Sequence, residues 1–466
     1  MNHCLLLIAA ALAAACSTTP VPGVCCIGPE DCTRLGLFED RACPAGQACV
    51  DFQCVVPSCS TQGCAAEAPV CNITTDVCTG CTDSADCSRF SDADVCDPQT
   101  GSCVDCLTAA DCTADKPICD HGSCRGCQLD TECPSDACGD DGTCVPEANI
   151  VYLHPNGLDV GTCRRAESCK RIQFGATKTS TTRNHIVLAA GLYDLGDGRE
   201  YITSQNTPAQ QLFIHGSGSV VRSINDVGAI YMGVTAVIRD LEIIGSSNKL
   251  DIFTTGRSIL ERIKMRGGGR GFGIHGGDVL MRDLSIEDVG YAIVLFGPTR
   301  LTLDRGIIKT PYKGISSNNY GTVVDISNLL IFGAAEVAVD LEYSAGGTVS
   351  FTTIADSGTD SGSGPRAFKC PQSGLTVRSS IIWAPGSAAR PAIDSGCTLS
   401  STIVGPTAVP GATNVDPRFV DAANRDYRLS AASPARDMVD TGPTTDFEGD
   451  PRPRGARFDI GADEAP

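Results

Sequence analysis

Ile238-Arg-Asp-Leu241-Glu-Ile243 is the clearest copy of a short pattern that occurs eight times between residues 237 and 405. Other well-formed copies are Leu260-Glu-Arg-Ile263-Lys-Met265, Met281-Arg-Asp-Leu284-Ser-Ile286 and Ile326-Ser-Asn-Leu329-Leu-Ile331, and the remaining four end at Ile307, Ile354, Ile381 and Ile403. Successive copies lie 21 to 27 residues apart. Self-similarity at this period indicates a solenoid, in which each coil stacks on the next.

Apolar and polar residues alternate within each copy, and a period of two residues is that of a strand rather than a helix. Each copy therefore predicts a strand, a polar bend and a second strand. A further apolar run follows in most copies, for example at Ala292-Ile293 and Ala367-Phe368. Three short strands in each coil predict an all-β fold, a right-handed parallel β-helix solenoid.

Charged pairs occupy the bends of three early copies, at Arg239-Asp240, Glu261-Arg262 and Arg282-Asp283, whereas later bends are predicted at neutral pairs such as Thr352-Thr353. The order of the signs alternates from copy to copy, and stacked coils lie about 4.8 Å apart. Each charge is therefore expected to face an opposite charge in the neighbouring coil. Such pairs contribute about 0.2 to 1 kcal/mol each, so their expected role is to specify the register of the coils.

Cysteines and acids are concentrated in residues 17–147, which hold 22 of the 28 Cys and 22 acidic against 5 basic residues. This acidic composition argues against nucleic acid and anionic membrane surfaces as partners. Because His121 is the one histidine of this segment, disulfides in an oxidising compartment are a better account of the cysteines than zinc. No cofactor is expected, and Ca²⁺ binding by the acids is left open although no EF-hand pattern is found.

From Cys59 onward, the cysteines of the acidic segment 25–147 recur in groups of four, after a first set of six. In the last three groups an acid precedes the second Cys, and Gly-Ser-Cys or Gly-Thr-Cys closes the group. This pattern predicts small modules, each with a tight turn between two strands and two disulfides in place of a sizeable core. A stalk is the main interpretation, and ligand binding by the modules is the alternative.

The first 15 residues form an apolar run that ends in small residues, which is typical of a secretory signal peptide. The junction Leu12-Ala-Ala-Ala15-Cys16 is similar to a bacterial lipoprotein processing site. That resemblance implies that Cys16 becomes the lipidated first residue, followed by a linker over residues 16–24. An ordinary cleaved signal with a free Cys16 is the alternative.

Two segments at the ends of the repeat region are similar to parts of known β-helix proteins. Val151-Tyr-Leu-His-Pro-Asn-Gly157 and His185-Ile-Val-Leu-Ala-Ala-Gly191-Leu-Tyr193 resemble the opening of bacterial right-handed β-helix proteins of the pectate-lyase superfamily. Asn414-Val-Asp416-Pro-Arg-Phe419, Asp446-Phe-Glu-Gly449 and Asp459-Ile-Gly461-Ala-Asp-Glu464 resemble the closing segment of surface-anchored β-helix proteins of the choice-of-anchor type. The resemblance implies a β-helix with an N-terminal cap over residues 148–412, a closing segment over 413–466 and export, but no activity.

Two further pairs of cysteines lie outside the acidic segment, Cys163 with Cys169 and Cys370 with Cys397. Cys370 and Cys397 are 27 residues apart, which is little more than one coil. Residues one period apart stack in a β-helix, within the Cα separation of about 4.4 to 6.8 Å that a disulfide tolerates. We therefore expect this pair to join adjacent coils, and Cys163 with Cys169 to form a local pair.

Ionisable residues at outward positions of the third strand are the weak candidates for catalysis. They are His275, Asp340, Lys369 and Asp394, with Glu342 and Tyr343 beside them. Polysaccharide-cleaving enzymes of the superfamily that the chain resembles use a base, clustered acids that hold Ca²⁺ and a basic cleft. A solvated face is the preferred interpretation because these residues do not form a triple-Asp calcium site.

The expected function is therefore that of an exported protein at a bacterial outer membrane or cell surface, anchored through a lipid. Its β-helix is expected to bind a polysaccharide or another surface without catalysis. A polysaccharide lyase or hydrolase that acts from the groove of the β-helix is one alternative. A purely structural envelope protein is the other.

Overall fold

The computed structural model describes residues 48–50, 53–55, 59 and 63–466, except 197, 225–227, 246–248, 360–366, 372–373 and 385–389. The expected signal peptide, Cys16, the linker 16–24 and most of the first six-cysteine module lie outside these residues. Contacts divide the chain into two units, one of residues 1–126 with 141–143 and one of residues 127–140 with 144–466. Among the described residues, no helix is long and apolar enough to cross a membrane.

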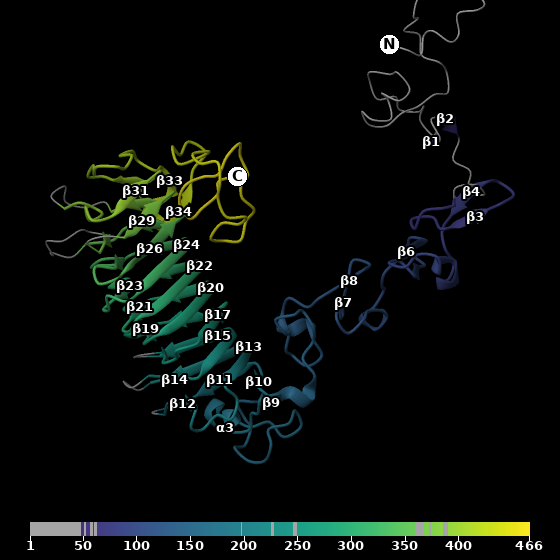
Figure 1. Cartoon of the computed structure of the whole chain (residues 1–466), viewed down its shortest axis with the longest axis horizontal. Helices are drawn as coiled ribbons and strands as arrows, with labels where there is room; N and C mark the ends of the chain where they lie inside the picture. The colour runs from purple at the N-terminus through teal and green to yellow at the C-terminus, as the bar shows by residue number, and fades with distance from the viewer. Residues whose placement is uncertain are drawn as a thin grey trace, which may run out of the picture. The chain divides into compact units, whose positions relative to one another are not determined.

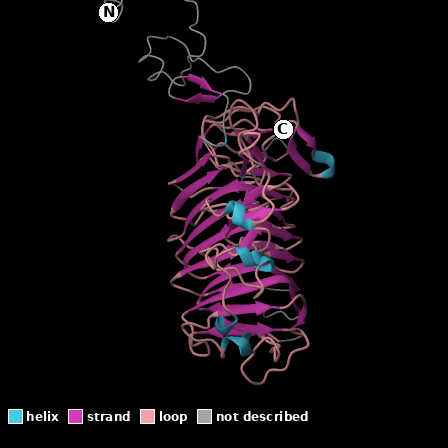
Figure 2. Cartoon of the chain, turned by 90° about the vertical axis from the view of Figure 1, so that its right-hand side faces the viewer, coloured by secondary structure: helices cyan, strands magenta, loops and turns pink. Residues whose placement is uncertain are grey.

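The second unit is a parallel β-helix, which confirms the predicted all-β solenoid (Figures 1 and 2). One sheet has 16 strands. They are β9 (Ile150–Leu153), β10 (His185–Leu188), β11 (Gly191–Asp194), β13 (Gln211–Ser223), β15 (Thr235–Gly245), β17 (Arg257–Glu261), β18 (Lys264–Arg266), β20 (Gly277–Glu287), β22 (Thr299–Lys309), β24 (Val323–Phe332), β26 (Gly346–Ser350), β27 (Thr353–Ala355), β29 (Leu375–Arg378), β30 (Ile381–Trp383), β31 (Thr398–Ser400) and β32 (Ile403–Gly405).

The other long sheet has eight strands and closes the opposite side of each coil. Its strands follow the order β12 (Glu200–Thr203), β14 (Ile230–Gly233), β16 (Leu250–Ile252), β19 (Arg270–Ile274), β21 (Tyr291–Leu295), β23 (Lys313–Ser317), β25 (Val339–Asp340) and β28 (Phe368–Lys369). Each strand pairs in parallel with the equivalent strand of the next coil. This sheet carries the third apolar run predicted for each coil.

The repeat of the sequence becomes a stack of buried side chains along the β-helix. Ile238 pairs with Leu260, Leu260 with Met281 and Met281 with Leu303, and all four are buried. On the eight-stranded sheet, Phe272 and Phe368 are fully buried. Apolar side chains one coil apart thus form a single continuous core.

From β15 onward, one non-glycine residue with a left-handed conformation turns the chain at each bend of the larger sheet. These residues are Asp240, Arg262, Asp283, Arg305, Asn328, Phe351, Ser379 and Ser401, with φ between +46° and +62°. Their stacking repeats the same strained turn in every coil. In the coil of Ile354, the turn lies at Ser350-Phe351 and not at Thr352-Thr353, the pair that the sequence suggests as the bend.

Ion pairs between coils connect the charged bends, as the alternation of signs predicts. The Arg262 guanidinium lies 2.6 Å from the Asp240 carboxylate, and Arg305 lies 2.6 Å from Asp283. In the neighbouring column, Arg239 lies 2.9 Å from Glu261. Because these groups are partly exposed, their main effect is on the register and not on stability.

A five-residue helix, α3 (Ile172–Ala176), covers the first coils at the N-terminal end of the β-helix. Ile172, Gly175 and Ala176 are buried, and Gly175 lies so close to Leu153 that a side chain there would clash. A disulfide between Cys163 and Cys169 closes the loop before this helix, with the Cα atoms 5.0 Å apart. Near the other end, Cys370 and Cys397 form a disulfide with a Cα separation of 5.4 Å.

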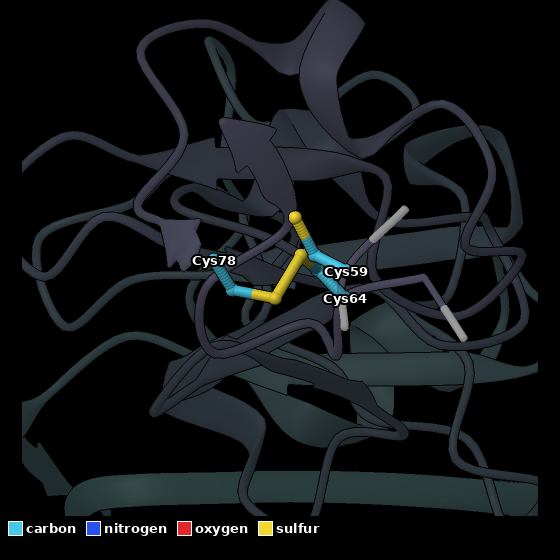
Figure 3. Close-up of side chains that lie close together, drawn as sticks. All are labelled: Cys59, Cys64 and Cys78. Carbon is cyan, nitrogen blue, oxygen red and sulfur yellow. A yellow bond between two sulfur atoms is a disulfide. The ribbon is translucent and has the colours of Figure 1, made fainter. Parts of the chain in front are cut away.

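The four-cysteine modules share one disulfide pattern, in which the first Cys pairs with the third and the second with the fourth. The bonds are 59–71 and 64–78, 81–96 and 87–103, 106–119 and 112–124, and 127–138 and 133–144. Figure 3 shows the bond between Cys64 and Cys78, with Cys59 beside it. Disulfide sulfurs are not thiolates, so these groups are not zinc sites.

The first three modules each contain a short antiparallel hairpin, the fourth has a single antiparallel bridge between Cys138 and Cys144, and the last three begin with a turn of 3-10 helix. The hairpins are β3–β4 (Val70–Asn72, Val77–Thr79), β5–β6 (Val95–Asp97, Ser102–Val104) and β7–β8 (Ile118–Asp120, Ser123–Arg125), with β1–β2 (Ala48–Val50, Gln53–Val55) before them. The helical turns are η1 (Ser84–Cys87), η2 (Ala109–Asp111) and η3 (Asp130–Glu132).

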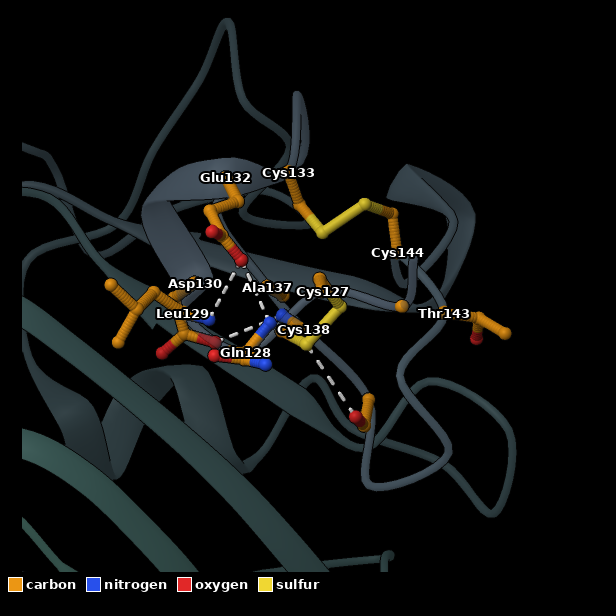
Figure 4. The surroundings of a disulfide bond; sticks show 12 residues. Cys127, Gln128, Leu129, Asp130, Glu132, Cys133, Ala137, Cys138, Thr143 and Cys144 are labelled. Atoms are coloured by element: carbon orange, nitrogen blue, oxygen red, sulfur yellow. Dashed lines mark hydrogen bonds between the residues drawn. A yellow bond between two sulfur atoms is a disulfide. The ribbon is translucent and has the colours of Figure 1, made fainter. Parts of the chain in front are cut away.

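The acid that precedes the second Cys of a module caps the start of its helical turn. Asp86 accepts a hydrogen bond from the Thr82 N–H at 2.8 Å, and Asp111 accepts one from Thr108 at 2.8 Å. Glu132 accepts from the N–H groups of Gln128 and Leu129 (Figure 4). The repeated acids therefore satisfy backbone donors at a helix start.

The fourth module, residues 127–144, belongs mainly to the same unit as the β-helix. Its Ala137 and Val145 pack with Ile150, Tyr152 and Val187 in one buried cluster. A second connection is polar, between the buried Asp130 of η3 and His215 of β13. This module is thus in direct contact with the first coils.

The closing segment follows the last coil and consists mostly of loops with η5 (Ala422–Asn424) and the hairpin β33–β34 (Phe419–Asp421, Asp426–Leu429). Its buried acids accept backbone hydrogen bonds. The Asp463 side chain accepts from the Leu429 N–H at 2.6 Å and is 6% exposed as a residue. Burial raises the pKa of Asp463 to about 6.

The Asp463→Asn variant is expected to be more stable than the wild type above pH 6. Because the pKa of Asp463 is higher in the folded chain than in the unfolded chain, its contribution to stability is present at low pH and is lost as the pH rises through about 6. Asparagine keeps an acceptor for Leu429 and cannot ionise. We expect a gain of about 1 to 3 kcal/mol at pH 7 and none near pH 4.

Thermal unfolding followed by circular dichroism between pH 4 and 8 measures this effect. Asp440→Asn is the control, since Asp440 is an exposed carboxylate of the same segment that pairs with Arg457 at 2.6 Å. Equal unfolding midpoints of wild type and Asp463→Asn at pH 7 would contradict the role of the buried carboxyl.

Candidate functional site

The outer face of the eight-stranded sheet brings two of the sequence candidates, Asp340 and Lys369, together. Alternation along each strand turns Val339 and Phe368 inward and Asp340 and Lys369 outward. The register then aligns one outward residue per coil. From β16 to β28 this row is Asp251, Gly273, Val294, Ser316, Asp340 and Lys369.

A cluster of ion pairs surrounds Asp340 at the C-terminal end of this row. Asp340 Oδ2 accepts a hydrogen bond from Lys313 Nζ at 2.9 Å and lies 3.7 Å from Lys369 Nζ. Lys369 Nζ also lies 4.0 Å from Glu342, and Lys313 Nζ lies 3.5 Å from Glu336. We call these five residues the Asp340 cluster.

Lys313 and Asp340, the central residues of the Asp340 cluster, are both partly or fully buried. Burial alone would lower the pKa of Lys313, but the hydrogen bonds to Asp340 and Glu336 and their charges together outweigh burial and raise it. Asp340 is 8% exposed, and its Oδ1 atom is buried without a hydrogen-bond partner. A buried carboxylate oxygen without a donor is costly, so the Asp340 carboxylate depends on the contacts that its other oxygen makes.

The other two sequence candidates do not belong to this cluster. Asp394 follows Ile393, which pairs with Phe368, so Asp394 lies one coil beyond Lys369. Its carboxylate accepts a hydrogen bond from the Gly396 N–H at 3.3 Å and shapes its own turn. His275 lies two residues beyond Gly273, the outward residue of β19, and therefore sits in the corner after the strand.

Exposed tyrosines gather around the eight-stranded sheet. Of the nine tyrosines of the chain, the five with exposed side chains are Tyr201, Tyr291, Tyr312, Tyr320 and Tyr343. Tyr201 belongs to β12 and Tyr291 to β21, Tyr312 directly precedes β23, and the other two follow β23 and β25. The larger sheet has no exposed tyrosine among its described residues.

Four of these tyrosines form two pairs that lie at the two edges of the Asp340 cluster. At the start of the strands, Tyr291 stacks on Tyr312 with ring centroids 6.0 Å apart. At the end of the strands, Tyr320 and Tyr343 meet edge to face, with ring centroids 5.3 Å apart. Tyr320 is 73% exposed, so its ring is open to a ligand.

A column of stacked rings covers the first half of the same face. Tyr231, Phe253, His275 and Phe296 follow one another with centroid distances of 4.5, 3.7 and 4.7 Å. Stacking covers the faces of the inner rings, so this column acts as a spine between coils and is not an open platform. Burial lowers the pKa of His275, which keeps its ring neutral at pH 7.

Asp251 lies beside this column and binds two guanidinium groups. Its carboxylate lies 2.6 Å from Arg199 and 3.1 Å from Arg270, and both arginines also contact aromatic rings. Sequence reasoning named His275 but missed Asp251, its two arginines and the column of rings. A signal existed, because Tyr231, Phe253, His275 and Phe296 are spaced by 22, 22 and 21 residues, the period of the coils.

The comparisons with known proteins find no relative of this chain. Neither a family model nor a curated protein nor a solved structure matches the chain. The function must therefore be argued from the geometry of the outer face.

Proposed function

We propose that this chain is an exported surface protein whose β-helix binds a glycan on the outer face of the eight-stranded sheet. The observation that supports it best is the gathering of all exposed tyrosines around this one sheet. Tyrosine offers a large apolar ring and a hydroxyl at little entropic cost, which suits a ligand with C–H faces and hydroxyl edges.

The Asp340 cluster supplies the polar part of the proposed site. Its lysines donate hydrogen bonds, its carboxylates accept them, and both kinds lie between the two tyrosine pairs. Sugar hydroxyls donate and accept hydrogen bonds, so such a mixed set of groups suits them. The row of one outward residue per coil also suits a ligand that is a linear chain.

Ten disulfides among the described residues indicate an extracellular or exported protein. We extend the proposal to a lipid anchor at Cys16 in a bacterial outer membrane, with the acidic modules as a stalk. Multiple acylation is required, because one acyl chain gives only marginal membrane affinity. The mass of the N-terminal peptide of the mature protein tests this anchor.

The proposal predicts that the purified protein binds immobilised glycans. A glycan array followed by isothermal titration with the best ligand measures this directly, and Tyr320→Ala is expected to weaken the binding. A purely structural envelope protein would bind no glycan on the array, and that result would overturn the proposal.

Lyase activity at the Asp340 cluster is the second candidate. It is favoured by one observation, the carboxylate of Asp340, whose Oδ2 lies close to two lysines while its Oδ1 has no hydrogen-bond partner. A lyase releases unsaturated ends from uronate polysaccharides, which absorb ultraviolet light. Formation of such ends, and its loss in both Asp340→Asn and Lys369→Met, would replace the binding proposal by a catalytic one.

A further inference from the structure

The corners that follow the eight-stranded sheet differ in length, and this creates a hollow on the β-helix. Seven residues, 204–210, connect β12 to β13, and four residues, 253–256, connect β16 to β17. Between these coils, Val234 alone connects β14 to β15. A one-residue corner between two longer ones must leave a notch, since the longer loops stand out on either side.

A groove of about 690 Å³ occupies this notch. The three corners line it together with the start of the next one, at His275. Its volume is within the range of about 300 to 1,000 Å³ that is typical of small-molecule sites. We call it the corner groove.

The lining of the corner groove is rich in hydroxyl groups and poor in charge. Ser204, Thr207, Thr235, Thr254 and Thr255 all border it. A hydroxyl donates one hydrogen bond and accepts up to two, so Thr207, which donates to Asn206 at 3.1 Å, and the Thr235–Thr254 pair at 3.4 Å still have capacity to accept from a ligand. None of the described lining residues is Asp, Glu, Lys or Arg.

Aromatic and apolar surface completes the lining. Phe253 and His275, two rings of the stacked column, border the groove, and Pro208 and Val234 lie with them. Burial lowers the pKa of His275, so this ring adds no charge at neutral pH. The guanidinium groups nearest to the column are held by Asp251 at 2.6 and 3.1 Å.

We propose that the corner groove binds a neutral, hydroxyl-rich sugar unit of the glycan that the outer face recognises. This inference rests on the proposed glycan-binding function and specifies its ligand class. A carboxylated or sulfated sugar would lose water on entering the groove and would meet no fixed positive charge there, which makes binding unfavourable. A neutral sugar offers hydroxyl edges to the serines and threonines and a C–H face to Phe253.

The experiment titrates the full chain with two sets of oligosaccharides of equal length. One set consists of glucose, galactose and mannose oligomers, and the other consists of the corresponding uronic acid oligomers. Thr255→Arg places a long charged side chain at the exposed rim of the groove, while Thr255→Ser keeps the hydroxyl and serves as the matched control. Circular dichroism verifies that both variants are folded.

We expect a neutral oligomer to bind, Thr255→Arg to weaken it at least tenfold and Thr255→Ser to leave it unchanged. Binding of uronic acid oligomers alone would overturn the inference but leave the proposed function standing. Neutral binding that Thr255→Arg does not weaken would also overturn it, because the site would lie elsewhere. If no glycan of either set or of the array binds, both the inference and the proposed function fail.

Discussion

Replacement of Asp130 by alanine is expected to lower the free energy of unfolding of the N-terminal end of the β-helix by about 3 to 5 kcal/mol. Asp130 belongs to η3 of the fourth module and is 2% exposed. Its Oδ1 lies 2.8 Å from Nδ1 of His215, which is 1% exposed, and accepts from the Cys138 N–H at 2.9 Å. The variant leaves both buried donors without a partner.

A second histidine, His185, extends this buried network. Nε2 of His215 lies 3.0 Å from Nδ1 of His185 in the neighbouring strand β10. Burial alone would raise the pKa of Asp130, but the interactions with His215, the Cys138 N–H and Arg239 together outweigh burial and lower it. Asp130 is therefore ionised at neutral pH, and its loss removes a buried carboxylate that accepts two hydrogen bonds.

Asp136→Asn is the control for Asp130→Ala, because asparagine removes the charge and tolerates the left-handed backbone of Asp136, with φ +57°. Asp136 is an acid of the same module that pairs with Arg165 at 2.9 Å, but 51% of its side chain is exposed. Its loss is expected to change stability by less than about 1 kcal/mol. Denaturant unfolding and limited proteolysis of the fourth module measure both variants, and equal effects would show that the buried pair has no special role.

Replacement of both Tyr320 and Tyr343 by alanine is expected to reduce the affinity for the glycan by about 30-fold or more. The two rings contact each other at 5.3 Å and are 73% and 40% exposed, so they offer more open aromatic surface than the inner rings of the stacked column. Loss of an aromatic side chain that dominates an interface costs about 2 kcal/mol or more, and about 1.4 kcal/mol corresponds to a factor of ten.

Tyr320→Phe with Tyr343→Phe is the control, because it removes the hydroxyls and keeps the rings. This variant should retain most of the affinity if ring stacking dominates. Isothermal titration with the best ligand from the array measures the affinity of both double variants. The comparison requires that the two variants have equal unfolding midpoints. Full affinity of the alanine variant would exclude the exposed tyrosines from the site and remove the main support for the proposed function.

The bends show how far the sequence reaches. The charge order at Arg239-Asp240 and Glu261-Arg262 correctly predicts ion pairs between coils, because residues one period apart must stack. The same reasoning predicts a later turn at Thr352-Thr353, but the structure has this turn at Ser350-Phe351. Phenylalanine is rare in a left-handed turn, so the pattern favours the polar pair Thr352-Thr353 as the bend.

The candidate site was predictable only in part. Asp340 and Lys369 lie in one outward row, because strand alternation and the coil period are enough to align them. His275 lies outside this row, because the two inward residues Phe272 and Ile274 place Gly273 at the outward position of β19. Counting residues from coil to coil fails wherever a corner gains or loses a residue.

The sequence by itself determined the parallel β-helix, the charged bends and the disulfide-rich modules, since alternation, period and cysteine spacing are local properties of the chain. Tertiary structure alone decided the contact of the fourth module with the first coils, where Asp130 meets a histidine 85 residues away. It also decided the corner groove, whose walls come from three coils with corners of seven, one and four residues. Such sites depend on how unequal loops lie beside one another in space, and this relation has no local pattern in the sequence.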